Sequence, residues 1–219
     1  MTAIEGVEVA IDREAVTVTA SRPLVVLSSA VVGGGLATAR AIVNLHVDKH
    51  CPWGDAELRL DAFAAGRGLP KPRVGLLTAA WTERAQVVGE HAHGISALVV
   101  TTVGLGNVVA AGWSPAAAAA PGTINTIVVV DAEVEPAALV NLALTVTEVK
   151  TLVLKAAGLP CADGRPPSGT STDAVVVAAT GRGPIVRFGG PISEAGWVVA
   201  QAARRGMTDG VRRWMDEHP

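Results

Sequence analysis

Two similar segments, each a Gly-Thr pair followed by a Val-Val-Val run, place the strongest constraint on how this chain can fold. Residues 121–130 and 168–177 both contain the pattern Gly-Thr-x-(Asn/Thr)-x-x-Val-Val-Val. Runs of β-branched residues favour buried strands. We interpret the segments as a weak internal repeat of two buried strands, each entered through a Gly-Thr turn and adjacent or pseudo-symmetric in one sheet. Chance similarity stays open as an alternative, because Gly, Thr and Val are common in this chain.

Composition narrows the class of protein. The 219 residues fit one domain spanning 1–219, and 49% hydrophobic against 17% charged residues excludes a disordered chain. A net charge of -2 argues against a nucleic-acid partner, since binding phosphates takes an excess of Lys and Arg. The sequence contains no run of about 18 apolar residues, so we expect no membrane-spanning helix. Residues 1–12 do not resemble a signal peptide, so we expect a cytoplasmic protein with no membrane partner, in which Cys51 and Cys161 are free thiols.

Hydrophobic periodicity and turn residues predict more strands than helices. Besides the two strands of the repeat, strands are expected at residues 7–11, 16–20, 24–27, 74–77, 85–90, 97–103 and 185–188. Helices are expected at residues 55–65, 136–157, 192–205 and 207–217, and residues 36–45 fit either type. Because several strands are joined as hairpins and the helices gather late, the pattern predicts an α+β fold. We expect a single domain with a mixed, mostly antiparallel sheet and helices packed on it.

A run of three glycines, Gly33 to Gly35, follows one of the short strands. Glycines allow the backbone to approach a ligand closely with unshielded N–H groups, which favours a binding loop. A strand-to-helix turn that needs positive φ explains the run equally well. The spacing does not match a phosphate-binding loop, because no Gly-Lys-Ser/Thr follows.

Histidines near acidic residues or cysteine form two weak candidates for metal binding or acid-base chemistry. One group lies in residues 46–51, and the other in residues 91–93. Isolated His and Asp residues in polar loops are more often solvated than bound to metal, and the second group fits a turn. We therefore predict no metal site and leave open the roles of His46, His50, His91 and His93.

The hydroxyl-rich stretch at residues 168–173 places several hydroxyl groups and the Asp173 carboxylate directly before the second strand of the repeat. This arrangement predicts a reactive edge held on a rigid support. In the middle of the helix at 136–157, Glu148 and Lys150 form a second group of charges. If both side chains are exposed, they are an ordinary solvated pair.

A series of short polar and glycine-containing blocks runs through most of the chain. In order, the blocks are Ser28-Ser29-Ala30 with Gly33-Gly34, Asn44, Gly75-Leu76-Leu77-Thr78-Ala79-Ala80, Thr102 to Asn107, Gly122-Thr123-Ile124-Asn125, Thr147-Glu148-Val149-Lys150-Thr151 and Gly169-Thr170-Ser171-Thr172-Asp173. Together they resemble the adenosylcobinamide amidohydrolase family. The resemblance covers residues 22–205, and its specificity lies in the order and number of the blocks.

Membership of that family would imply hydrolysis of the amide that joins aminopropanol to the propionyl arm of the corrin ring in adenosylcobinamide. The product would be adenosylcobyric acid, and the step would belong to corrinoid salvage, which remodels corrinoids towards coenzyme B12. The resemblance also implies a small-molecule corrinoid substrate. It implies no cofactor of the protein's own, since the substrate carries the cobalt, and it leaves homo-oligomerisation open.

Amide hydrolysis needs a nucleophile or an activated water, a base, and donors for the developing oxyanion. The Gly-x-Ser-x-Gly motif of many hydrolases is absent from the sequence. The candidate catalytic residues are therefore Asp173 or Glu148 as a base that acts on water or on Thr170, with metal-free water attack preferred. A Thr nucleophile freed by self-cleavage is disfavoured, because Thr170 lies within the chain.

Other blocks supply groups that could hold the substrate. The side chains of Asn44 and Asn125, with the backbone N–H groups at Gly34 and Gly169, are expected to polarise the scissile carbonyl. The full set of expected substrate-binding residues is Ser29, Gly33, Gly34, Asn44, Thr78, Asn107, Thr123, Asn125, Lys150, Gly169 and Thr172.

Two alternative functions remain at this point. A corrinoid-binding module without turnover would use the glycine loops and walls of small residues to hold a large planar ligand. An amidohydrolase for another bulky amide would keep the chemistry and change the substrate. Release of aminopropanol from adenosylcobinamide distinguishes both from the first interpretation.

Overall fold

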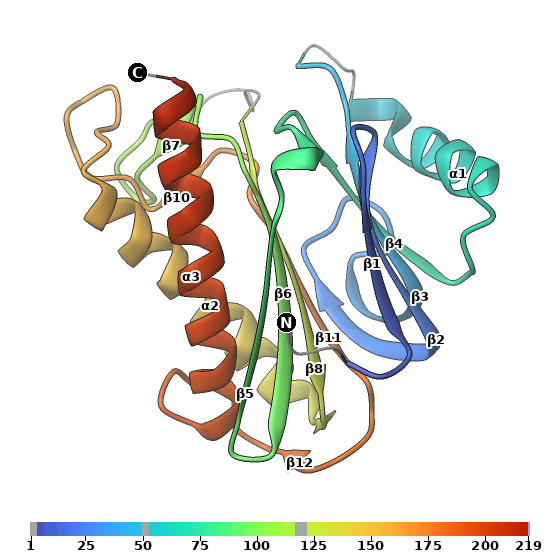
Figure 1. Cartoon of the computed structure of the whole chain (residues 1–219). Helices are drawn as coiled ribbons and strands as arrows, with labels where there is room; N and C mark the ends of the chain where they lie inside the picture. Colours follow the sequence, from blue (N-terminus) through green and yellow to red (C-terminus); the bar gives the residue numbers. More distant parts are fainter. Residues whose placement is uncertain (1–3, 50–52, 117–121, 219) are drawn as a thin grey trace.

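A computed structural model of the chain describes residues 4–49, 53–116 and 122–218 (Figure 1). The strands are β1 (Val7–Ile11), β2 (Ala15–Ser28), β3 (Gly35–His46), β4 (Arg73–Thr78), β5 (Gln86–Ala92), β6 (Ile95–Val103), β7 (Val108–Val109), β8 (Ile124–Asp131), β9 (Glu133–Val134), β10 (Gly169–Thr170), β11 (Ala174–Ala179) and β12 (Ile185–Val186). The α-helices are α1 (Ala56–Gly66), α2 (Pro136–Ala157) and α3 (Glu194–Glu217), and η1 (Trp53–Asp55) and η2 (Thr82–Arg84) are short 3-10 turns.

Eight of these strands form one sheet in the order β4-β3-β2-β11-β8-β6-β5, with β1 paired to β2. In this sheet β3 and β4 run parallel, as do β8 and β11, while the other neighbours are antiparallel. The predicted α+β fold with a mixed, mainly antiparallel sheet is therefore confirmed.

The two strands of the internal repeat, β8 and β11, are direct neighbours, as the repeat predicts. They pair in parallel from Asn125 opposite Ala174 to Val130 opposite Ala179. The sequence pattern would instead match Ile127 with Ala174, so the strands are offset by two residues relative to the repeat. An offset of two keeps the alternation of faces, which leaves equivalent residues on the same side of the sheet.

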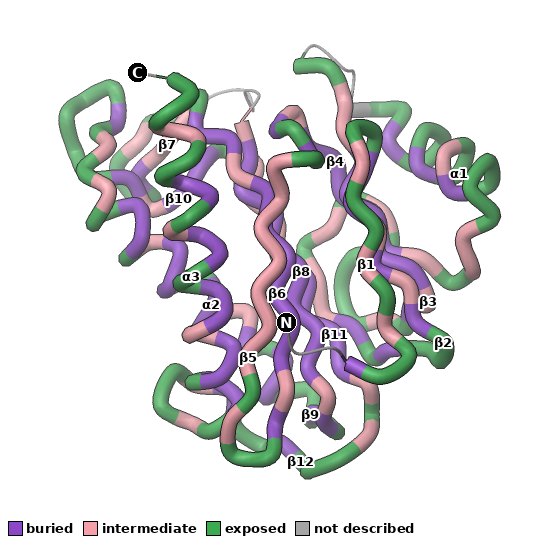
Figure 2. The backbone as a smooth tube through the Cα atoms, viewed as in Figure 1, coloured by how far each residue is buried: buried purple, intermediate pink, exposed green. Residues whose placement is uncertain are grey.

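The sheet folds over itself, so that the chain forms four layers (Figure 1). One buried cluster lies between the two halves of the sheet and joins residues of β2, β3 and β4 to residues of β6, β8 and β11. A second cluster lies between β6, β8, β11 and the helices α2 and α3, and a third packs α1 on β3 and β4. Figure 2 shows the central strands largely buried and the outer side of α1 exposed.

Alternation along β8 divides its side chains between two of these clusters. Val128 and Val130 face the helices, whereas Ile127 and Val129 face the other half of the sheet. Both faces are apolar because both are covered, which explains the continuous Val-Val-Val run. Residues before Ile127 keep the same alternation. Asn125, near the start of the strand, therefore faces the other half of the sheet, as Ile127 does.

Two predicted breaks are wrong. Residues 16–20 and 24–27 belong to one strand, β2, in which Arg22 and Pro23 lie within a bulge between Thr19 and Leu24. Residues 192–205 and 207–217 belong to one helix, α3.

Gly206 does not end this helix, because it packs closely on the sheet. A Cβ there would lie 3.4 Å from Val88, and one at Gly210, a turn later, would lie 2.7 Å from Val103. Residues 36–45, open between helix and strand, belong to β3.

Helix α2 begins with Pro136 in its first turn and ends at Gly158, whose φ of 72° is the left-handed conformation typical of a C-cap. By length and composition it could also cross a membrane. However, Leu139, Leu142 and Val146 are fully buried in the cluster that the helix forms with the sheet. The helix therefore serves as a core helix that carries Lys150 to the edge of β10 and β11.

Two leucines on α2 offer a matched test of this packing. Leu142 is fully buried, whereas Leu144 is 55% exposed. We expect Leu142→Ala to lower the free energy of unfolding by about 3 kcal/mol, because it leaves a cavity against the sheet. Leu144→Ala should change it by less than about 0.5 kcal/mol. Urea denaturation measures both, and equal losses would contradict the packing of α2.

Candidate active site

The layer between the two halves of the sheet turns polar at one end. Asn125 on β8 donates from Nδ2 to Asn44 Oδ1 (2.8 Å) and to the Leu77 carbonyl (2.9 Å). Asn44 on β3 donates in turn to Thr102 Oγ1 on β6 (2.9 Å). All three side chains are at most 2% exposed. Residues from four strands are thus joined by a buried polar network.

One atom of this network has no partner. The Oδ1 of Asn125 is buried and accepts no hydrogen bond from the described residues. A buried polar atom without a partner costs about 1–3 kcal/mol, and such atoms call for an explanation in a native fold. The free carbonyl oxygen of Asn125 is therefore a candidate acceptor for a donor group of a ligand or a water.

Beside this network, hydroxyl groups gather around the carbonyl of Gly122. Thr170 Oγ1 and Thr172 Oγ1 each lie 3.0 Å from Gly122 O. Thr172 Oγ1 is also in short hydrogen-bond contact with Thr123 Oγ1, which lies 3.3 Å from Thr172 O. Each hydroxyl has one proton to donate, so a hydroxyl that contacts both the carbonyl and another oxygen can donate to only one of them at a time.

The Asp173 carboxylate holds this cluster together. Its Oδ1 accepts from Ile124 N (2.9 Å) and from the Thr170 hydroxyl, and its Oδ2 accepts from Thr170 N (2.9 Å) and from the Lys150 ammonium. The side chains of Asp173 and Lys150 are only 9% and 11% exposed. Four donors from α2, β8 and β10 therefore converge on one carboxylate.

This geometry makes Asp173 a positioning residue. Successive side chains of a strand point to opposite faces, so Thr172 faces Thr123 in the polar layer and Asp173 faces Lys150 on the helix side. Gly169 is required here, because a Cβ would lie 2.5 Å from Asp173 Oδ2 and 2.8 Å from Lys150 Nζ. A carboxylate that already accepts four hydrogen bonds has little capacity to take a proton from water.

The remaining expected site residues form two groups: those that contacts place at or near the polar cluster, and those that no contact brings there. Asn107 donates to Ser171 Oγ (2.6 Å) and packs on Gly122, and Thr78 accepts from Ala80 N (3.0 Å) directly after Leu77. These lie at the polar cluster. Ser29 accepts from Val175 N (3.0 Å), two residues beyond Asp173.

Three expected residues are not brought to the cluster by any contact among the described residues. Glu148 is exposed, and two positions on a helix turn its side chain roughly 200° from that of Lys150. Gly33 lies against Arg73, at the opposite end of β4 from Thr78, roughly 16 Å along the strand. A Cβ at Gly33 would meet the Arg73 carbonyl at 2.6 Å, and one at Gly34 would clash with Ala30 O, so close backbone packing explains these glycines.

Within the described residues, no group of three His, Cys, Asp or Glu could hold a metal ion. His46 stacks on Trp81, His91 contacts Ser96 Oγ (2.9 Å), and His93 lies in the β5–β6 turn. His50 and Cys51 lie outside the described residues. Burial, with a contribution from Asp163, raises the pKa of the Cys161 thiol, which makes it a poor nucleophile.

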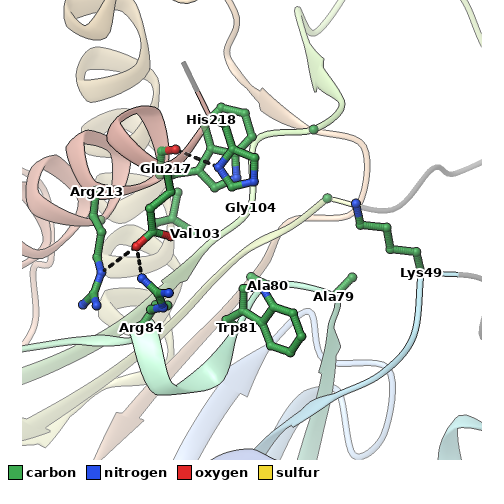
Figure 3. Close-up of a pocket in the computed structure, with 14 residues that line it drawn as sticks. Lys49, Ala79, Ala80, Trp81, Arg84, Val103, Gly104, Arg213, Glu217 and His218 are labelled. Atoms are coloured by element: carbon green, nitrogen blue, oxygen red, sulfur yellow. Dashed lines mark hydrogen bonds and ion pairs between the residues drawn. The ribbon is translucent and has the colours of Figure 1, made fainter. Parts of the chain in front are cut away.

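A pocket of about 180 Å³ opens beside the cluster (Figure 3). Gly104 and Gly122 form part of its wall, next to Ala79 and Ala80. Around its rim, Trp81 stacks on His46 (4.8 Å between ring centroids), and Trp214 stacks on His218 (4.3 Å). On one side Glu217 pairs with Arg84 and Arg213, and Lys49 approaches from the other.

A larger hollow of about 580 Å³ lies between α2 and α3. Its wall is mainly apolar, with Leu152, Val153 and Met215, and its charged residues are Arg204, Arg212 and Asp216. Gly122, whose carbonyl the threonine hydroxyls contact, lines the smaller pocket and does not line this hollow. The smaller pocket is therefore the better candidate for chemistry.

Sequence reasoning assigned no role to several residues that the structure brings to the site. The carbonyl of Gly122 is a backbone group and has no sequence signal of its own. Thr102 and Gly104 lie within one of the quoted blocks, and Trp81 directly follows another. The one sequence signal for these residues is that the blocks containing them lie at the same end of several predicted strands.

The site combines hydroxyl groups around a carbonyl with buried carboxamides and an ion pair, and a pocket opens beside them. Such polar groups fit a hydrolase that acts on acyl groups. The comparison with protein families agrees with this class. The family model of adenosylcobinamide amidohydrolase (CbiZ) matches residues 1–219, and the chain belongs to that family. It is therefore a hydrolase, as its resemblance to the family implied.

One solved structure shows the same fold at low sequence identity, and a second matches with a lower score. A β-aminopeptidase of a Burkholderia species matches with a TM-score of 0.50 and 14% identity, covering 92% of this chain and 79% of its own. A protein of Pyrococcus horikoshii matches with a TM-score of 0.48 and 11% identity, covering 94% and 83%. No curated protein matches the sequence.

The ion pair at Asp173 yields a test of the anchoring role. In Asp173→Asn, the amide NH2 group would face either the Lys150 ammonium and the Thr170 N–H, or the Ile124 N–H, and the ammonium would lose its counter-charge. We expect the free energy of unfolding to fall by about 3 kcal/mol. Glu148→Gln, which changes an exposed carboxylate on α2, should alter it by less than about 0.5 kcal/mol. If Asp173→Asn unfolds in urea at the wild-type midpoint, the anchoring role is wrong.

Proposed function

We propose that this protein hydrolyses the amide that joins aminopropanol to the propionyl arm of adenosylcobinamide, giving adenosylcobyric acid in corrinoid salvage. The observation that carries the proposal is the family match over residues 1–219. Water is added across the C–N bond: the acyl carbon gains oxygen, and the amine leaves with a proton. We place the reaction in the cytoplasm.

The size of the pocket determines how such a substrate would bind. Sites that enclose a drug-sized ligand measure about 300–1,000 Å³. The pocket beside Gly122 has about 180 Å³, so it suits a short amide arm and leaves a corrin ring outside. The ring would then rest on the rim, where Trp81 is 55% exposed and offers a flat apolar face.

The polar end of the layer supplies the groups that amide hydrolysis needs. The hydroxyls of Thr170 and Thr172 contact the carbonyl of Gly122, which lines the pocket, and Thr123 contacts Thr172. The Oδ1 of Asn125, which has no partner among the described residues, can accept a hydrogen bond from a buried water. Attack by water or a hydroxyl group requires no metal, and the proposal includes none.

Incubation of the purified protein with adenosylcobinamide tests the function directly. We expect stoichiometric release of aminopropanol and formation of adenosylcobyric acid, measured by mass spectrometry. Tight binding of the corrinoid without release would contradict the proposal and favour a corrinoid-binding module. Release of amines only from other bulky amides would place the substrate in another class.

A tryptophan pair tests where the ring binds. Trp81→Ala removes the flat rim of the pocket, and we expect KM to rise about fivefold with kcat unchanged, which corresponds to about 1 kcal/mol of lost stacking. Trp113→Ala is the matched control, because Trp113 is 67% exposed, stacks on Arg165 and does not line the pocket. Equal KM values for the two variants in steady-state kinetics would show that the ring does not rest on Trp81.

A further inference from the structure

The peptide bond between Gly122 and Thr123 has an unusual environment. Its carbonyl oxygen lies 3.0 Å from two hydroxyl oxygens: the Thr172 hydroxyl can donate to it, and the Thr170 hydroxyl shares its single proton between this oxygen and Asp173. Donors that converge on a carbonyl oxygen stabilise the negative charge that develops there when the carbon is attacked. The surroundings of the Gly122–Thr123 peptide bond therefore resemble those of an oxyanion site.

A nucleophile stands next to this carbonyl. The hydroxyl oxygen of a threonine can reach the carbonyl carbon of the preceding residue through a five-membered ring. Thr123 is 3% exposed, and its Oγ1 is in short hydrogen-bond contact with Thr172 Oγ1, which helps to hold it in place. The residue that supplies the nucleophile and the carbonyl that would be attacked are thus consecutive in the chain.

The residue before Thr123 must be glycine. Gly122 has a φ of 133°, a conformation that other residues rarely adopt, and a Cβ would clash with Asn107 Oδ1. Without a side chain, the carbonyl carbon is open to attack. Gly122 also lines the pocket, so that water has a route to the bond.

We propose that the chain cleaves its own Gly122–Thr123 bond and that Thr123 is the nucleophile of the hydrolase. Thr123 Oγ1 attacks the Gly122 carbonyl carbon, the hydroxyl proton passes to the Thr123 nitrogen, and the C–N bond breaks to give an ester. Water then hydrolyses the ester, which leaves a carboxylate on Gly122 and both a free hydroxyl and a free α-amine on Thr123. No oxidant, reductant or metal takes part.

The new α-amine would lie at the pocket. A Cβ at Gly104, another residue of the pocket wall, would lie 3.5 Å from Thr123 N, so the absence of a side chain there leaves space beside the amine. An α-amino group has a pKa of about 7.7–8.0, which suits a general base near neutral pH. This second part rests on the proposed function: the amine would take the Thr123 proton as the oxygen attacks the substrate amide, and an ester on Thr123 would then be hydrolysed.

The geometry favours Thr123, and not Thr170, as the residue at which the chain would cleave itself. The Thr170 hydroxyl is engaged with the Asp173 carboxylate and with Gly122 O, so it acts as a donor. Thr123 occupies the equivalent place in the first copy of the repeat, and its hydroxyl instead contacts the second copy at Thr172. The two copies therefore have different tasks: one carries the bond, and the other polarises it.

Intact-mass measurement of the purified full-length protein tests the proposal. We expect two fragments, residues 1–122 and 123–219, whose summed mass exceeds that of the uncut chain by one water. Thr123→Ala should remain a single chain, whereas Thr123→Ser should still cleave because it keeps a hydroxyl. Thr172→Val should slow cleavage about a hundredfold, as loss of one oxyanion donor does in enzymes.

Thr126→Val is the matched control. Thr126 is 1% exposed on the same strand, and an odd number of positions separates it from Thr123, which puts it on the opposite face. This variant should cleave at the wild-type rate. Wild-type protein that stays uncut after prolonged incubation while it releases aminopropanol would overturn self-cleavage and leave the proposed function standing. Cleaved protein that releases no aminopropanol would support self-cleavage and contradict the proposed function.

Discussion

The site depends on one carboxylate that accepts four hydrogen bonds. Asp173 draws together the ammonium of Lys150, both the N–H and the hydroxyl of Thr170, and the backbone of Ile124. These donors come from a helix and from two strands that are distant in sequence. Because the pair is almost completely shielded from water, each member is costly to leave alone, and this cost keeps the elements in place. The Gly122 carbonyl and its hydroxyl donors are positioned as a result.

The sheet separates the ion pair from the polar groups beside which we propose that the reaction takes place. Asp173 and Lys150 lie on the helix side, whereas Thr172, Thr123 and Asn125 face the layer between the two halves of the sheet. The same alternation fills that layer with apolar side chains further along the strands. A polar pocket therefore forms only at the end of the layer, where the apolar residues stop. The chain belongs to the adenosylcobinamide amidohydrolase family, and we propose that the pocket beside Gly122 takes the amide arm of the substrate.

Local pattern was sufficient for much of the fold and for naming many of the polar residues that the structure brings together at the candidate site. The Val-Val-Val runs predicted two neighbouring buried strands, and the hydroxyl-rich stretch before Ala174 was rightly expected to lie on a rigid support. Three-dimensional packing was needed elsewhere. Gly206 resembles a helix break in the sequence, but α3 continues through it against β5, and Gly210 one turn later lets the helix approach Val103 on β6. Whether Glu148 or Lys150 faces Asp173 depends on the docking of α2, and the role of a backbone carbonyl such as that of Gly122 has no signal in the sequence.

We propose that the chemistry takes place at the Gly122 end of the layer between the sheet halves. A crystal structure with the product adenosylcobyric acid would show where the reaction occurs. We expect the carboxyl group of the propionyl arm to lie in the pocket, within hydrogen-bond distance of Thr123 or Asn125, with the corrin ring outside near Trp81. A corrinoid bound in the larger hollow between α2 and α3, with the polar cluster empty, would show that the chemistry takes place elsewhere.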